Sequence, residues 1–274
     1  MTEIIEKIAL ASDVFLMRLK EPLIAAKRRA GQFVILRLSE KGERIPLTIV
    51  DSDPNIGTIT IVFQVVGKTT SLLSSMKVGD HITDVVGPLG RPTEIEEFGS
   101  VVIIGGGIGI AVAYPIAKAM KQSGNTVISI LGARSANLLI LEQEVRAVAD
   151  EVIVTTDDGS LGVKGFVTDS LKRLLDSRKI DLVVAIGPVP MMKAVSEMTR
   201  PYSVKTIVSL NPIMVDGTGM CGACRVMVEG RIKFACVDGP EFNGHDVDFK
   251  DLAMRLTAYR ELEKTALAMY RGRH

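Results

Sequence analysis

The sequence predicts a chain of α/β plus all-β class: an N-terminal antiparallel β-barrel, a doubly wound parallel sheet, and a small C-terminal module that ends in a helix. Changes in residue composition and in hydrophobic pattern along the 274 residues predict this organisation. Residues 1–97 contain short runs rich in Val, Ile and Thr that are broken by turns. Residues 98–208 alternate apolar strands with helical segments, and residues 209–274 hold all three cysteines. These three ranges are the predicted domains.

The barrel is predicted from four runs, which read QFVILRLSE, RIPLTIVD, GTITIVFQVVG and DHITDVVGP. β-Branched residues at this spacing are typical of short antiparallel strands. The second domain is predicted from strands that read SVVIIGG, TVISILGA, EVIVTTDDG, DLVVAIGP and SVKTIVSL. Runs that are apolar on both faces, with helical segments between them, indicate a parallel sheet covered on both sides.

The tail of the chain predicts a last helix, because its apolar residues recur at helical spacing and need a surface to lie against. These residues are Phe249, Leu252, Leu256, Tyr259, Leu262 and Ala266.

Composition excludes several classes of function. The chain is 47% hydrophobic and 24% charged, as in an ordinary globular protein. Its net charge of +1 gives no electrostatic reason to expect nucleic acid or an anionic membrane as a partner. Residues 98–117 carry no charge, but their glycines and a proline favour a buried strand and turn over a membrane helix. The N-terminus lacks the apolar stretch of a signal peptide, so we expect a cytoplasmic protein.

A glycine-rich turn follows the first parallel strand, in VVIIGGGIGIA. Glycine there lets the backbone approach a phosphate closely, and the start of the next helix offers free N–H donors. The same turn is also common for packing reasons alone. The acidic residue that usually follows about 20 residues later is missing, since the next strand ends at Arg134 and Ser135. A second loop, at Gly187 and Pro188, ends another strand and is expected to face the same crevice.

The cysteines follow an iron–sulfur pattern. Plant-type [2Fe–2S] sites use C-x4-C-x2-C and a more distant cysteine. Here Asp216 occupies the place of the first cysteine, followed by Cys221, Cys224 and Cys236. A carboxylate is a suitable hard ligand for ferric iron, so we predict these four as cluster ligands. Three alternatives remain open: a structural zinc with the same ligands, free cysteines, and Asp216 as a turn residue beside the cluster.

Several stretches together resemble the ferredoxin-reductase-type flavoprotein family. They are RIPLTI (44–49), FQVVGKTT (63–70), GGGIGIA and IGPVPMM. With the cysteine turn, TTDDGSLGVKGFVTD and ACVDGPEFNGHDVDF, the chain resembles a narrower group over nearly its whole length. That group contains the electron-transfer subunit of type B dihydroorotate dehydrogenase and the small subunit of NADH-dependent reduced ferredoxin:NADP oxidoreductase, also called sulfide dehydrogenase.

The resemblance implies three cofactors: FAD in the barrel, NAD(H) rather than NADP(H) in the crevice, and a [2Fe–2S] cluster. Thr48 is the candidate catalytic residue, because its hydroxyl would suit a hydrogen bond near the reactive flavin nitrogen. The residues implied at the flavin are Arg44, Ile45, Pro46, Leu47, Thr48, Val62, Phe63, Gln64, Thr69 and Thr70. The residues expected at the dinucleotide are Gly105, Gly106, Gly107, Ile108, Gly109, Arg134, Gly187 and Pro188.

This sequence departs from the family pattern at three positions. Many members place an arginine directly before Pro46, whereas here Ile45 separates Arg44 from it. Ile186 stands where the broader family often has cysteine, close to the nicotinamide. Asp216 replaces the first of the four cysteines of the dihydroorotate type, which favours the ferredoxin:NADP oxidoreductase branch.

The favoured hypothesis is therefore an electron-transfer flavoprotein subunit. It would pass electrons between NAD(H), FAD and the cluster, to or from a larger flavin and iron–sulfur subunit that serves ferredoxin. An electron-transfer subunit for dihydroorotate oxidation or for a hydrogenase is the alternative. A non-redox zinc-binding module is the second alternative.

Overall fold

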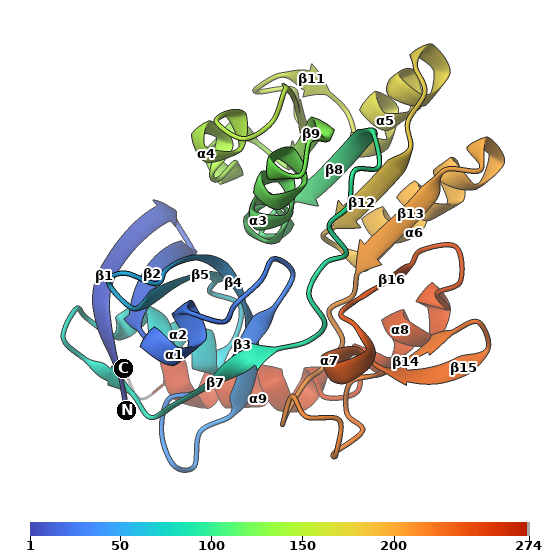
Figure 1. Ribbon diagram of the computed structural model, residues 1–274. Coiled ribbons are helices and arrows are strands. Elements are labelled where there is room, and N and C mark those ends of the chain that lie inside the picture. The colour runs from blue at the N-terminus through green and yellow to red at the C-terminus, as the bar shows by residue number, and fades with distance from the viewer. Residues whose placement is uncertain (273–274) are drawn as a thin grey trace.

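The computed structural model describes residues 1–272 as two large sheets and a small C-terminal module (Figure 1). The N-terminal sheet is antiparallel, in the order β6-β1-β2-β5-β4-β3-β7. Its strands are β1 (Thr2–Ala11), β2 (Val14–Lys20), β3 (Phe33–Arg37), β4 (Arg44–Asp53), β5 (Thr58–Gln64), β6 (His81–Ile82) and β7 (Asp84–Leu89). The two edge strands are separated only by Thr83, so the sheet curls into a nearly closed barrel, as predicted. Two short helices, α1 (Pro22–Ala25) and α2 (Lys68–Ser75), accompany it.

The second sheet has the order β11-β10-β9-β8-β12-β13-β16. All of its pairs are parallel except that of β16. Its strands are β8 (Ser100–Gly106), β9 (Thr126–Ala133), β10 (Glu151–Thr156), β11 (Val163–Lys164), β12 (Leu182–Ile186), β13 (Lys205–Ser209) and β16 (Glu241–Asn243). The order reverses between β8 and β12, which makes that point the switch of a doubly wound sheet.

Helices cover both faces of this sheet, because its strands are apolar on both. On one face, Ile116 of α3 (Gly109–Gln122) packs with Val101 and Ile103. On the other face, Leu171 of α5 and Val195 of α6 share a cluster with residues of β8 and β12. The remaining helices of this region are α4 (Glu142–Arg146), α5 (Val167–Ser177), α6 (Val189–Thr199), and the 3-10 turns η1 (Ala136–Leu138) and η2 (Arg200–Tyr202).

The C-terminal module packs against α6 and adds β16 to the edge of the parallel sheet. It contains the hairpin of β14 (Arg225–Val228) and β15 (Arg231–Phe234), then α7 (Ala235–Asp238) and α8 (Phe249–Arg255). The predicted last helix is divided, since a turn separates α8 from α9 (Arg260–Arg271). No residue of α9 is buried, and the helix packs against α2 of the barrel.

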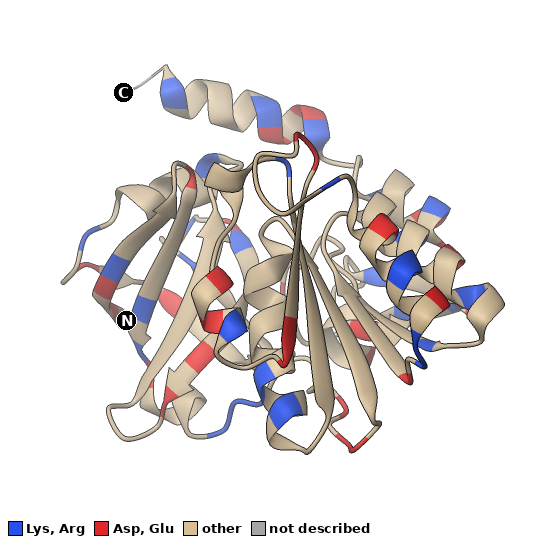
Figure 2. Cartoon of the chain, turned by 90° about the horizontal axis from the view of Figure 1, so that it is seen from above, with Lys and Arg blue, Asp and Glu red and all other residues tan. Residues whose placement is uncertain are grey.

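Charges of both signs are interspersed over the molecule, and α9 itself carries bands of each (Figure 2). None of the helices formed by residues 1–272 combines the length and apolar character needed to cross a membrane.

Candidate functional site

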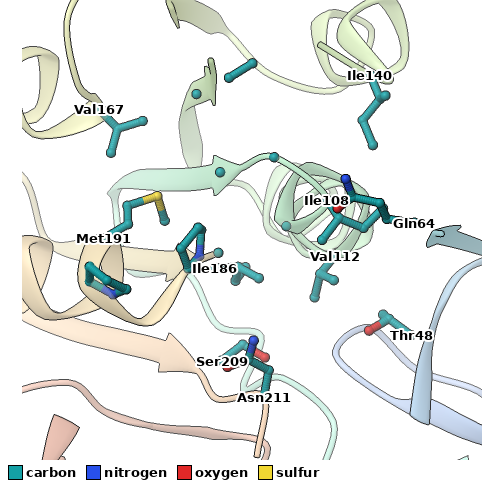
Figure 3. Close-up of a pocket in the computed structure, with 18 of the residues that line it drawn as sticks. Thr48, Gln64, Ile108, Val112, Ile140, Val167, Ile186, Met191, Ser209 and Asn211 are labelled. Atoms are coloured by element: carbon teal, nitrogen blue, oxygen red, sulfur yellow. The ribbon is translucent and has the colours of Figure 1, made fainter. Parts of the chain in front are cut away.

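A cavity of about 830 Å³ lies between the outer face of the barrel and the carboxyl ends of the parallel strands. Figure 3 shows Thr48 and Gln64 on the barrel side, and Ile108, Ile186 and Met191 on the other. The cavity coincides with the switch point between β8 and β12, where open α/β sheets bind their ligands.

The barrel contributes alternate residues of β4 to this cavity, because successive strand residues point to opposite faces. Pro46 and Thr48 line the cavity, while Ile45 and Leu47 pack with the barrel core. Gln64, the exposed last residue of β5, lines the cavity beside them. The sequence motif RIPLTI therefore divides between two faces.

Five other predicted flavin residues do not line this cavity. Phe63 belongs to the barrel core, and Val62 belongs to an apolar cluster shared with α3. Arg44 is exposed at the start of β4. Thr69 donates a hydrogen bond to Glu43, and the Thr70 hydroxyl accepts hydrogen bonds from the N–H groups of residues 66 and 67 at the start of α2. Their roles toward a flavin remain predictions.

The first glycine turn combines packing with access to the cavity. A Cβ on Gly105 would lie 2.8 Å from Ile110 Cα, and one on Gly109 would lie 2.8 Å from the carbonyl carbon of Ile186. Gly107 instead has a φ of +56° and nothing within 4 Å of its Cβ position. Gly105 and Gly109 therefore serve close packing, whereas the open space at Gly107 leaves phosphate binding there as a prediction.

Most of the predicted dinucleotide residues line the cavity together. They are Gly106, Gly107, Ile108, Gly109, Arg134, Gly187 and Pro188, whereas Gly105 does not. Ile186, the position of the second departure, also lines it and is buried. The two loops are in direct contact, because a Cβ on Gly187 would lie 3.1 Å from the Gly106 carbonyl oxygen.

Other lining residues were missed from the sequence. Asp157 follows the end of β10, Ser209 is the last residue of β13, and Leu210 and Asn211 follow that strand. Their position at the ends of parallel strands was a usable signal, since all such ends meet at one edge. Met191 lies in the stretch IGPVPMM, close behind the predicted loop at Gly187 and Pro188, so its position was also a usable signal. Phe33 gave no signal, because only the tertiary packing brings it here.

The cysteine turn follows β13 and leads into β14. Cys224 and Cys236 are buried with their sulfur atoms 3.1 Å apart, while Cys221 is exposed. Asp216 accepts hydrogen bonds from the Thr218 N–H at 3.0 Å and the Cys221 N–H at 3.2 Å. Within residues 1–272, no three His, Cys, Asp or Glu side chains are gathered closely enough to hold a metal ion. Three of the four predicted ligands therefore lie in the turn, and Cys236 lies on α7. They form two pairs, Asp216 with Cys221 and Cys224 with Cys236.

The electrostatics of the two pairs differ. Hydrogen bonds, first from the Thr218 backbone N–H, hold the pKa of the Asp216 carboxyl below its ordinary value. Burial, and to a smaller extent the Cys224 thiol, raises the pKa of the Cys236 thiol to about 12. The hydrogen bonds therefore favour the anionic form of Asp216, whereas burial favours the protonated thiol of Cys236, which must lose its proton to bind a metal ion.

Comparison with known proteins identifies the parts of this arrangement. Residues 2–93 match the family model of the oxidoreductase FAD-binding domain, and residues 211–248 match that of the iron–sulfur cluster binding domain of dihydroorotate dehydrogenase B. A Thermotoga maritima homologue of the dihydroorotate dehydrogenase B (NAD⁺) electron-transfer subunit is 54% identical, over 96% of this chain and 93% of that protein.

The chain belongs to the dihydroorotate dehydrogenase B electron-transfer subunit family.

Two further proteins are similar to this chain over most of its length. The electron-transfer subunit from Fusobacterium nucleatum is 32% identical, over 89% of this chain and 96% of that protein. A solved structure of an NADH-dependent reduced ferredoxin–NADP oxidoreductase, described for flavin-based electron bifurcation, has a TM-score of 0.94 and 52% identity, and covers 98% of both chains. The resemblance and the fold class predicted from the sequence are thus confirmed.

The cavity fits the flavin expected of this family. Its volume lies in the range of roughly 300–1,000 Å³ that is usual for small-molecule sites, and its walls are mostly apolar with a few polar groups. Such a lining suits an aromatic ring with polar edges, and the hydroxyl of Thr48 and the amide of Gln64 are polar groups on the barrel side.

The cysteine turn also suits the cluster of this family. Three thiols and one carboxylate supply ligands appropriate to iron. Gly217, Gly219 and Gly222 have φ of +77°, +85° and +68°, so the turn follows a path that other residues rarely adopt. A hydrogen bond from the Gly219 backbone lowers the pKa of the Cys236 thiol, against the effect of burial. Hydrogen bonds to the sulfur atoms are one factor that tunes iron–sulfur clusters.

Proposed function

We propose that this chain is the small subunit of an NADH-dependent ferredoxin:NADP oxidoreductase, passing electrons between NAD(H), FAD, a [2Fe–2S] cluster and a larger subunit. The observation that carries the proposal is the match to the ferredoxin–NADP oxidoreductase structure over 98% of both chains. The single cavity joining barrel residues to two glycine loops supports it, because a flavin and a nicotinamide must meet face to face.

The residues of the cavity act by alignment. The loops at Gly106 to Gly109 and at Gly187 would hold the dinucleotide, with the start of α3 facing its phosphates. Thr48 and Gln64 would orient the flavin from the barrel face. Bound FAD would supply the redox chemistry, namely two-electron hydride exchange with NAD(H) and one-electron transfer to a cluster. The apolar lining excludes water from the transfer.

The family name supports a second candidate, an electron-transfer subunit for dihydroorotate oxidation, on the 54% identity with the Thermotoga maritima homologue. The four predicted ligands support the first, because the resemblance assigns one aspartate and three cysteines to the ferredoxin:NADP branch. In both cases the homologues support a larger catalytic partner. We also propose a cytoplasmic location, where thiols stay reduced.

Purification with the natural partner tests the proposal. We expect a yellow-brown complex with flavin, iron and acid-labile sulfide, whose absorbance bleaches with NADH. A partner with its own flavin and [4Fe–4S] motifs would support the first candidate, and a dihydroorotate-oxidising partner would support the second. A colourless protein that contains zinc would contradict both.

A further inference from the structure

A second cavity, of about 290 Å³, lies on the outer side of the cysteine turn. It is lined by Cys221, by Arg225 and Arg255, by Tyr259, and by apolar residues of α8 and of the segment before the turn. Figure 1 shows α8 beside β14, which brings the two arginines to one place from different elements. Among the described residues that line this cavity there is no Asp or Glu.

Two successive hydrogen bonds connect the arginine side chains to the cysteine turn. Arg225 Nη1 donates a hydrogen bond at 3.2 Å to the carbonyl oxygen of Gly222, and Gly222 directly follows Cys221 in the chain. Arg255 Nε donates to the Arg225 carbonyl oxygen at 3.1 Å. In the part of the chain that the structure describes, neither arginine forms an ion pair, and no carboxylate lines the cavity between them.

Two positive charges beside one small cavity repel each other, and an anion nearby relieves that repulsion. The predicted cluster supplies one. Two ferric ions and two sulfides carry two net positive charges, and three thiolates with one carboxylate add four negative ones. The assembly is therefore an anion, and each electron it accepts turns one ferric ion into ferrous and adds a further negative charge.

We propose that Arg225 and Arg255 are charge-compensating residues that raise the reduction potential of the cluster held by this turn. The proposal rests on the proposed function. Both arginines line the same small cavity as Cys221. Charges closer together than roughly 8 Å, the Debye length at physiological ionic strength, are incompletely screened. Positive charge at that range stabilises the reduced state more than the oxidised state.

The test is a potentiometric titration of the purified complex, followed by the electron paramagnetic resonance signal of the reduced cluster. The variants are Arg225→Gln, Arg255→Gln and the charge-retaining Arg225→Lys. The matched control is Arg231→Gln, which removes the same charge from the far end of the same hairpin, where Arg231 pairs with Val228 and lies outside the cavity.

We expect Arg225→Gln and Arg255→Gln to shift the midpoint potential of the cluster to more negative values. The shift should be smaller at high salt, because salt screens the charges. Arg225→Lys and Arg231→Gln should stay near the wild-type value, with unchanged g-values in all variants. Wild-type potentials in both glutamine variants at full iron and sulfide content would overturn the proposal, as would an equal shift in Arg231→Gln. If Arg225→Gln loses its iron, Arg255→Gln decides alone. A wild-type complex without labile sulfide would instead overturn the proposed function.

Discussion

Thr48 is the polar residue of the motif RIPLTI that the alternation of β4 directs into the main cavity. On the proposed function, its hydroxyl hydrogen-bonds the flavin during hydride transfer. Thr48→Val keeps the shape and removes that bond, which contributes about 1 kcal/mol. We expect unchanged flavin content and a roughly fivefold slower reduction by NADH in stopped flow. Thr48→Ser should retain most of the rate, and a wild-type rate for Thr48→Val would show that the hydroxyl has no such role.

Glu241 on β16 gives the molecule a pH-dependent stability. Its Oε1 accepts a hydrogen bond from the Thr93 hydroxyl at 2.6 Å, at the junction of barrel, linker and C-terminal module. Burial raises the pKa of Glu241 to about 7, with the Thr93 hydrogen bond acting in the opposite direction. The folded state therefore retains a proton that the unfolded state has lost, so this stabilisation is full below the unfolded pKa of about 4.3 and is lost as the pH rises through 7.

We expect Glu241→Gln to remove this loss of stability. At pH 8 the free energy of unfolding of the variant should exceed that of the wild type by about 2 kcal/mol, a value reduced for the partial exposure of the carboxyl. Urea unfolding at pH 5, 6, 7 and 8 measures the difference. Glu94→Gln is the control, since Glu94 is exposed and pairs with Lys205. Parallel pH profiles for wild type and Glu241→Gln would contradict the assignment.

At the scale of elements, the junction of β8 and α3 depends on two different glycines. Gly109→Ala directs a methyl group onto the Ile186 carbonyl, so the start of α3 and the end of β12 must separate. Such overpacking costs typically about 1–3 kcal/mol. Gly107→Ala meets nothing within 4 Å and strains only a φ of +56°, at a cost of about 1 kcal/mol. Urea midpoints should fall further for Gly109→Ala, and equal midpoints would argue against a tight strand–helix junction.

The same elements show what the sequence can and cannot predict. The switch-point rule is a local pattern, so it places the two glycine loops at one crevice from the sequence alone. Pro46 and Thr48 are expected at the flavin only through the family resemblance, and strand alternation explains why they line the cavity while Leu47 does not. The directions of Val62 and Phe63 depend on barrel closure and on the docking of α3, which no local pattern specifies. The pairing of β16 with β13 also has no local signal, because more than thirty residues separate the two strands.

At the scale of the whole molecule, the barrel and the parallel sheet share a core. Val50 and Val62 of the barrel pack in one buried cluster with Ile110 of α3 and Leu131 of β9. Beside it, Lys118 of α3 and Asp51 of the barrel form an ion pair at 3.3 Å. A buried cluster that belongs to both domains couples their unfolding, because neither domain can open without exposing apolar surface of the other.

We therefore expect the two domains to unfold as one unit, although their sheets are separate. Ile110→Ala removes a fully buried side chain from the shared cluster and should lower stability by about 2–5 kcal/mol. Amide hydrogen exchange measured peptide by peptide would follow both sheets at once. The protection of β5 in the barrel should fall by the same free energy as that of β8 in the parallel sheet. If β8 loses protection while β5 keeps it, the two domains unfold independently, which would contradict this prediction.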